Sequence, residues 1–144
     1  MELDETDKRI LELLSHNSRM SYSDLAKHFG FSDVAVRKRV DKLVENKVIQ
    51  KFTTVLDYEK LGKNVSAFIF FKTRSDKTQQ VAEQLLEIDC IYDVYISLGV
   101  YDIIAKSYCS DVTELKTLTE VKLTEINGII EVKPSIVFDE VKSE

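Results

Sequence analysis

The chain has 144 residues, of which 44% are hydrophobic and 31% charged, with one Pro and four Gly, which excludes an intrinsically disordered protein. No apolar run approaches the roughly 20 residues of a membrane span, and the N-terminus lacks the basic and apolar regions of a signal peptide, so we expect a cytoplasmic protein. Twenty basic and 25 acidic residues give a net charge of −5, which does not by itself suggest a nucleic-acid partner.

The first 50 residues predict a small three-helix bundle. We expect helices from just after Asp4 to about Ser15, over about 21–29 and over about 32–46. Ser21 and Ser32 are the predicted N-cap residues of the second and third helices, and Gly30 supplies the stop between them. A short helix, a tight turn and a basic helix are typical of a winged-helix-like helix-turn-helix that reads DNA.

The third predicted helix is basic although residues 1–50 contain nine basic and nine acidic residues. On a helical wheel, Arg37 and Lys38 lie away from the apolar side near the helix start, so we predict that they read base edges. The predicted phosphate contacts come from Arg39, Lys42 and the backbone N–H groups capped by Ser21 and Ser32. The alternative is that these cations only keep a helix face solvated.

A change of period after the third helix predicts a linker. Val48–Asp57 is rich in β-branched residues and is predicted to form a strand. Tyr58–Asn64 is polar and contains a glycine, which indicates a hinge. The sequence therefore divides into a helix-turn-helix domain at 1–50, a strand and hinge linker at 51–64, and a second domain at 65–144.

The second domain predicts the element order βαββαβ. The expected elements are strands over 66–73, 92–98, 101–109 and 129–141 and helices over 76–88 and from Asp111 to about Thr124. This order predicts a ferredoxin-like sandwich of the α+β class, with the last strand at an edge of the sheet. Pro134 supports the edge position, because proline within a sheet is confined to edges and bulges.

The first strand of this domain is apolar on both faces. Ala67, Ile69 and Phe71 alternate with Phe68 and Phe70. Because helices cover only one face of a two-layer fold, the other face would be an exposed aromatic patch of a kind that soluble monomers avoid. We therefore expect a homodimer, in which the sheet of a second copy covers this face.

The hairpin around Gly99 and Asp102 is a candidate ligand site. Gly99 allows a close approach of the backbone, Asp102 could accept an ammonium group, and loop N–H groups could bind a carboxylate. From the residues alone, an ordinary hairpin with a solvated Asp102 is the better interpretation. Cys90 and Cys109 are predicted to be buried thiols in a reducing compartment, with a disulfide as the less favoured option.

The sequence offers no signature of catalysis. The two histidines, His16 and His28, lie in different helices, and with no spaced His/Cys cluster we expect no metal site and no cofactor. Neither a nucleophile–base signature nor a Gly-rich phosphate loop is present, so we do not expect an enzyme.

Taken together, these motifs resemble the Lrp/AsnC family of bacterial and archaeal transcription regulators. The resemblance covers nearly the whole chain and rests on Leu3-Asp4-x-x-Asp7-x-x-Ile10-Leu11, Asp24-Leu25-Ala26, Gly30-Phe31-Ser32, Val36-x-x-Arg39-Val40-x-x-Leu43, Val48-Ile49, Leu61-Gly62, Gly99-x-Tyr101-Asp102 and the closing 128–138 strand. It implies a helix-turn-helix that binds palindromic promoter DNA. It also implies an effector domain that dimerises, assembles into octamers and binds an amino acid between dimers.

The resemblance assigns effector-binding residues, and it makes the hairpin a binding element. The implied contacts are Leu98, Gly99, Val100, Tyr101 and Asp102 of the hairpin, Lys116 and Glu120 of the second helix, and Ser135 of the last strand. The predicted function is thus a DNA-binding regulator that responds to an amino acid. The alternatives are a small-molecule sensor that acts through protein partners, a metabolic enzyme on the same fold, and RNA recognition through the sheet.

Overall fold

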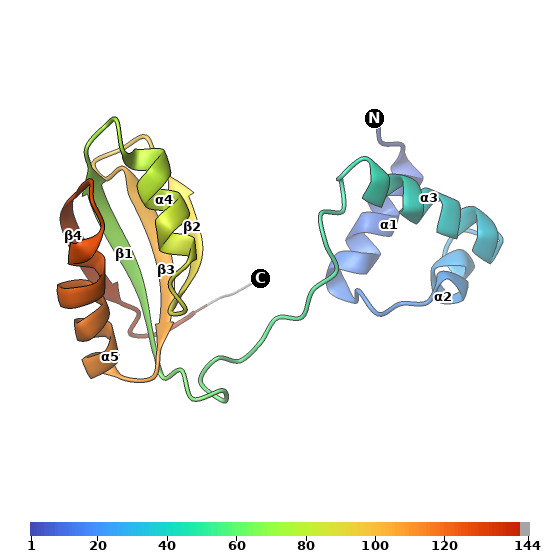
Figure 1. Ribbon diagram of the computed structural model, residues 1–144. Helices are drawn as coiled ribbons and strands as arrows, with labels where there is room; N and C mark the ends of the chain where they lie inside the picture. The colour runs from blue at the N-terminus through green and yellow to red at the C-terminus, as the bar shows by residue number, and fades with distance from the viewer. Residues whose placement is uncertain (142–144) are drawn as a thin grey trace. The chain divides into compact units, whose positions relative to one another are not determined.

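The computed structural model describes residues 1–141, so the last three residues of the predicted second domain lie outside the described residues. It divides into two compact units, Met1–Val55 and Leu56–Glu144 (Figure 1). Each unit has its own hydrophobic core. None of the helices described is both long and apolar enough to cross a membrane.

The first unit is the predicted three-helix bundle. Its helices are α1 (Glu5–His16), α2 (Tyr22–Lys27) and α3 (Asp33–Glu45). The side chains of Asp4, Ser21 and Ser32 each accept the backbone N–H three residues ahead, at 2.7, 3.0 and 3.2 Å. Gly30 has a φ of 65°, a left-handed backbone conformation that is strained for most residues other than glycine. Both predicted caps and the glycine stop are confirmed.

The core of this bundle follows the helical period of the sequence. The buried apolar side chains are Ile10, Leu14, Leu25, Ala26, Val36, Val40 and Leu43. Val36, Val40 and Leu43 lie at the i, i+4, i+7 positions of α3 that were predicted to face inward. The opposite side of α3 is therefore left to solvent.

The strand predicted over Val48–Asp57 is wrong. None of these residues lies in a strand, and residues 50–57 form a segment without regular secondary structure. Its apolar side chains Phe52, Val55 and Leu56 are exposed. β-branched residues favour an extended backbone, but a strand also needs a neighbouring strand to pair its N–H and C=O groups. Residues 1–141 provide no such neighbour for this segment.

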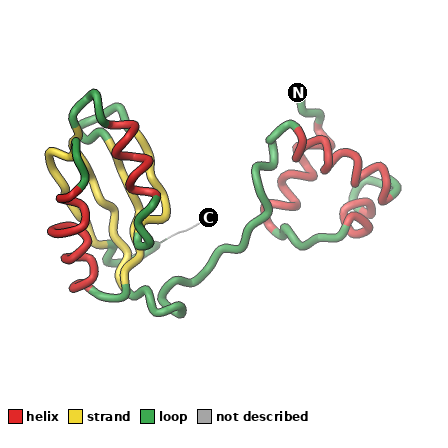
Figure 2. Tube along the Cα trace, in the orientation of Figure 1, coloured by secondary structure: helices red, strands yellow, loops and turns green. Residues whose placement is uncertain are grey.

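The second unit is the predicted ferredoxin-like sandwich. Its elements are β1 (Val65–Thr73), α4 (Thr78–Leu86), β2 (Ile91–Ile96), β3 (Ile103–Cys109), α5 (Val112–Thr117) and β4 (Ile129–Ile136). The antiparallel sheet has the order β2-β3-β1-β4, and both helices lie on one of its faces (Figures 1 and 2). The predicted edge position of the last strand is confirmed.

Most predicted boundaries are correct to within about two residues, but two elements end well before their predicted ends. The helix expected to reach Thr124 ends as an α-helix at Thr117, then widens into a π-helical turn over Leu118–Lys122 and tightens into a 3₁₀ turn over Leu123–Glu125. The change of pitch lets both Leu118 and Leu123 reach the core, where each is buried. The last strand ends at Ile136 rather than at residue 141, because its pairing with β1 ends at Ile136.

The central strand β1 has the two apolar faces that its sequence predicts. Ala67, Ile69 and Phe71 are fully buried beneath the helices. Phe68 is 38% exposed and Phe70 is half-buried on the other face. The sheet of one chain therefore leaves an aromatic surface uncovered.

Candidate functional site

The outward side of α3 carries three exposed cations. The Arg37 side chain is 68% exposed, and its Nε lies 3.8 Å from the Asp41 carboxylate. Lys38 and Lys42 are exposed and form no ion pair with any residue of the described chain. These three side chains can therefore meet an external anion with little competition from this unit.

Arg39 is held inside the bundle instead. Its Nη1 donates to the carboxylates of Asp4 at 2.7 Å and Asp7 at 2.8 Å, and its guanidinium lies 5.8 Å from the centroid of the Phe31 ring. Asp7 is only 5% exposed, so the ion pair neutralises a buried charge. The structure therefore favours a role in fixing α3 to the start of α1 over the predicted phosphate contact.

The ionisation of this network follows its hydrogen bonds. The backbone N–H of Asp7 and then the Arg39 guanidinium lower the pKa of Asp4 below its ordinary value. The hydrogen bonds to Asp4 and then Asp7 raise the pKa of Arg39. Both shifts favour the charged forms, so the pair stays ionised across the neutral range.

The capping serines have their hydroxyl oxygens engaged within the bundle. Ser21 and Ser32 accept from Asp24 and Ala35, respectively, and each satisfies an N–H at the start of its helix. The predicted phosphate contact of the N–H groups that these serines cap stays a prediction.

The second unit contains a groove between α5 and the edge strand β4. Its volume is about 280 Å³, and it is lined by Val112, Leu115, Lys116, Thr119, Glu120, Pro134 and Ile136. Most of these side chains are apolar, and Lys116 and Glu120 add one charge of each sign. The family resemblance implied effector contacts at Lys116 and Glu120, and both line this groove. The other lining residues were not predicted as effector contacts.

The hairpin after β2 does not line this groove in its own chain. Leu98 and Val100 are exposed at its tip. Asp102 closes its base, since its carboxylate accepts the backbone N–H of Thr73 at 2.8 Å and its own N–H donates to the Phe71 carbonyl at 2.8 Å. One oxygen of the predicted ammonium acceptor is therefore engaged in joining the hairpin to β1.

Ser135 lies on a different face from the groove. It pairs with Phe68 across the β1–β4 ladder, whereas its neighbours Pro134 and Ile136 pair with the buried Ile69 and Ala67. Because side chains alternate along a strand, Ser135 belongs to the open aromatic face. Of the eight predicted effector residues, only Lys116 and Glu120 line the groove of their own chain.

The open face is more aromatic than the alternation of β1 alone predicts. The ring of Tyr58 stacks on that of Tyr108 with centroids 4.0 Å apart, and Tyr92 meets both rings edge-on. The Lys106 ammonium lies 5.3 Å from the ring centroids of both Phe68 and Tyr108. Tyr58 belongs to the predicted hinge, and nothing in its local sequence indicates that it folds over the sheet.

Both halves of the chain match known family models. Residues 3–44 match the AsnC-type helix-turn-helix domain, and residues 66–144 match the Lrp/AsnC ligand binding domain. The HTH-type transcriptional regulator LrpA of Pyrococcus horikoshii is 35% identical over 140 residues, which is 97% of this chain and 99% of that protein.

Solved structures share the fold along the whole chain. AsnC of E. coli superposes with a TM-score of 0.92 at 27% identity, covering 100% of this chain and 97% of that one. The regulator NMB0573 of Neisseria meningitidis, solved in complex with L-Met, has a TM-score of 0.92 at 21% identity, covering 99% and 94%. At that identity the second comparison shows the fold alone.

Replacing Arg39 should destabilise the first unit. Arg39→Met keeps the apolar stem but leaves the buried Asp7 without its cation, so we expect a loss of about 1–3 kcal/mol in the free energy of unfolding. The matched variant Arg37→Met removes an exposed cation and should cost less than about 0.5 kcal/mol. Hydrogen–deuterium exchange of the α3 amides in the full-length protein measures both. Equal losses in the two variants would contradict the assignment.

Proposed function

The chain belongs to the Lrp/AsnC family of transcriptional regulators, and on that basis we propose how its two units act. The first unit binds double-stranded promoter DNA, and the second binds an amino acid that changes assembly or DNA affinity. The main observation behind this proposal is that one chain carries both a solvent-facing basic helix and a separate apolar groove with paired charges. We propose a cytoplasmic regulator and not an enzyme.

The recognition surface consists of the exposed cations of α3. Arg37 and Lys38 lie in its first two turns, the part of a recognition helix that contacts base edges in helix-turn-helix proteins. Lys42 follows one turn later and contacts the backbone. Arg39 positions this helix through Asp4 and Asp7 rather than binding phosphate itself. Its ion pairs keep the start of α1 against α3, so the reading residues are presented on a rigid support.

The groove between α5 and β4 suits a free amino acid. Glu120 can accept the ammonium group and Lys116 can bind the carboxylate, because a free amino acid carries both charges. The apolar lining from Val112, Leu115 and Ile136 favours an apolar side chain. A volume of about 280 Å³ accommodates a single amino acid but little more.

The open sheet face forms a dimer with a second copy of the chain. Phe68 and Phe70 lie on the same face of the sheet as the tyrosine cluster of Tyr58, Tyr92 and Tyr108. The apolar surface therefore continues across the sheet. The same face on an identical chain is its natural complement in an isologous pair. Two recognition helices then act together, which fits palindromic promoter sites with half-sites about one helical turn, or a multiple of it, apart.

The hairpin at Leu98–Asp102 contributes to the groove of another copy. In its own chain it does not line the groove, yet Leu98 is fully exposed at its tip. Dimers that dock hairpin to groove would build a larger ring, such as an octamer, with the amino acid at the junction. Ligand binding then alters the spacing of the DNA-binding units by changing the assembly.

DNA binding should depend on the outward cations of α3. We expect the double variant Arg37→Ala, Lys38→Ala to bind the chain's own promoter at least about tenfold more weakly, since it loses base contacts and counterion release. The control double variant Lys8→Ala, Arg9→Ala removes two exposed cations of α1 and should bind like the wild type. Salt-titrated gel shifts compare the three proteins.

Two results would speak against this DNA-binding surface. Equal affinity of the α3 double variant and the wild type would place the recognition surface elsewhere. If the wild type shows no DNA affinity even at low salt but is stabilised by an amino acid, the chain is a sensor that acts through protein partners.

One of the twenty amino acids should stabilise the protein through the groove. At a hundredfold excess over its Kd, a ligand adds about 2.7 kcal/mol of stability, which a thermal-shift screen detects. Glu120→Gln should remove this shift, whereas Lys122→Gln, an exposed neighbour outside the groove, should keep it. L-methionine is included first because the N. meningitidis protein was solved with it. No shift with any amino acid would refute the sensing role.

The dimer should depend on the open sheet face. Phe68→Asp replaces a central aromatic ring by a carboxylate beside Lys106 and should yield monomers at micromolar concentration, because dimerisation would then have to remove a pair of charges from water. Leu86→Asp changes an exposed apolar residue on α4, on the other side of the sheet, and should leave the dimer intact. Analytical ultracentrifugation measures the masses, and circular dichroism verifies the fold. A Phe68→Asp protein that folds and remains dimeric would exclude this interface.

A further inference from the structure

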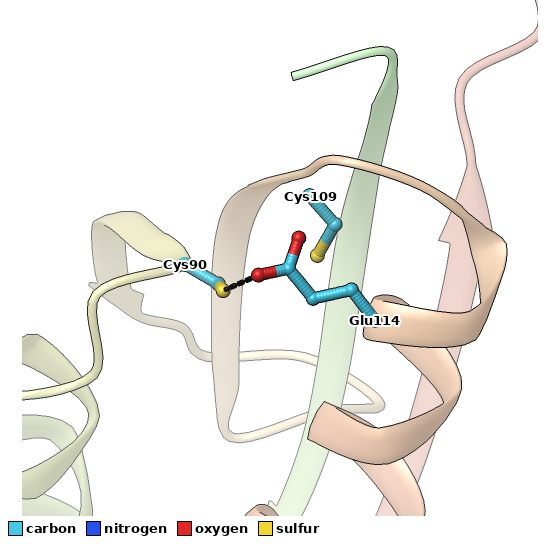
Figure 3. A group of neighbouring side chains, drawn as sticks. All are labelled: Cys90, Cys109 and Glu114. Atoms are coloured by element: carbon cyan, nitrogen blue, oxygen red, sulfur yellow. Dashed lines mark hydrogen bonds between the residues drawn. The ribbon is translucent and has the colours of Figure 1, made fainter. Parts of the chain in front are cut away.

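Two thiols and one carboxylate meet at the end of the sheet nearest the linker. Cys90 precedes β2, Cys109 ends β3 and Glu114 lies in the first turn of α5 (Figure 3). The Sγ atoms and a carboxylate oxygen all lie within 4.8 Å of one another. Cys109 and Glu114 lie close together in sequence, but Cys90 is 24 positions from Glu114, so spacing alone could not reveal the cluster.

The separation of the donor atoms suits a metal ion of the zinc class. The Cys90 Sγ lies 3.4 Å from Glu114 Oε1. A tetrahedral Zn²⁺ with bonds of about 2.3 Å to sulfur and about 2.0 Å to oxygen holds two such donors about 3.5 Å apart. The thiol–carboxylate pair is thus already spaced as two corners of a tetrahedron, with the second thiol beside it.

Glu114 is oriented toward the thiols by the helix cap. Its Oε2 accepts hydrogen bonds from the backbone N–H and the hydroxyl of Ser110, which leaves Oε1 directed at the sulfur atoms. These hydrogen bonds, first that of the Ser110 N–H, lower the pKa of Glu114 to about 2. These hydrogen bonds therefore hold one carboxylate oxygen in place beside the thiols.

The two thiols of the site are buried, whereas the Glu114 carboxylate and the nearby Lys63 are partly exposed. Cys90 and Cys109 are 3% and 0% exposed and both are free thiols. About a third of the Glu114 side chain is exposed, as is a similar share of Lys63, whose Nζ lies 3.9 Å from Glu114 Oε1. An ion can enter by a movement of these two side chains without unfolding the sheet.

We propose that Cys90, Cys109 and Glu114 form a binding site for a thiophilic divalent cation, with water as the fourth ligand. Binding exchanges two thiol protons for one divalent ion, so the cluster keeps a formal charge of minus one that Lys63 continues to balance. A disulfide between the thiols is the less suitable use of this arrangement, because it would remove the Cys90 S–H that donates to Glu114 Oε1 and leave that oxygen only the Lys63 ammonium, 3.9 Å away.

This site is separate from the amino-acid groove. Glu114 projects from the side of α5 opposite Val112, Lys116 and Thr119. Lys63 and Asn64 connect the cluster to the end of the linker, since the Asn64 side chain donates to the Ser110 carbonyl at 3.4 Å. A bound ion would therefore stiffen the point where the linker enters the second unit.

Cobalt titration of the full-length protein tests the proposal. Protein reduced with a phosphine and stripped with a chelator is titrated with Co²⁺, whose thiolate complexes absorb by charge transfer and whose visible bands report tetrahedral geometry. We expect one Co²⁺ per chain, displaced by Zn²⁺. Glu114→Gln should weaken Co²⁺ binding at least about tenfold while the thiolate band remains. The control Glu125→Gln, an exposed glutamate outside the cluster, should bind like the wild type.

The cysteine variants decide which atoms hold the ion. Cys90→Ala and Cys109→Ala should each abolish the charge-transfer band while circular dichroism shows an intact fold. If the fully buried Cys109 does not tolerate alanine, Cys90→Ala alone is decisive. A band that survives in Cys90→Ala, or no band in the reduced wild type, overturns the proposal. Disulfide formation with oxidised glutathione in a protein that takes up no Co²⁺ also overturns it, and assigns the pair to redox chemistry.

Discussion

The second unit depends on one constraint, which is that β1 must satisfy apolar side chains on both of its faces. Ala67, Ile69 and Phe71 draw α4 and α5 onto one face, and burying each large apolar side chain contributes roughly 1.5–3 kcal/mol. Phe68 and Phe70 leave the other face in need of a cover. A strand with one polar face would need no cover on that face. The aromatic face of β1 instead favours association with a second copy of the chain.

The same strand also positions the groove and the hairpin. Its register with β4 places Pro134 opposite Ile69 and Ile136 opposite Ala67, on the helix-covered side, where they become a wall of the groove. Its last residues hold the hairpin, because the Asp102 backbone N–H donates to the Phe71 carbonyl and the Thr73 N–H donates to the Asp102 carboxylate. Groove and hairpin are thus fixed at different places of the second unit.

Local sequence signals predicted the helices and the sheet topology. The features that depend on contacts between residues distant in sequence could not be predicted from them. The caps at Ser21 and Ser32 and the alternation along β1 were predictable, because each depends on residues within one turn or one strand. The structure of the segment over 48–57 was not predictable in this way, because residues with high strand propensity form a strand only when a neighbouring strand pairs with them. Arg39 was assigned to phosphate from its residue type and position, and Asp102 to the effector from the family resemblance. Each nevertheless has carboxylate or backbone partners from distant parts of its own unit. The Cys90–Cys109–Glu114 cluster arises only when three elements converge.

The position of β4 has a consequence for the order in which the protein is made. The groove needs both α5 and the last strand, and β4 pairs with a strand that left the ribosome more than fifty residues earlier. The helix-turn-helix relies on contacts within the first fifty residues and can fold while the remainder is still being synthesised. A nascent chain therefore acquires its DNA-reading surface before its sensor, and a chain truncated before residue 129 would retain the first without the control of the second.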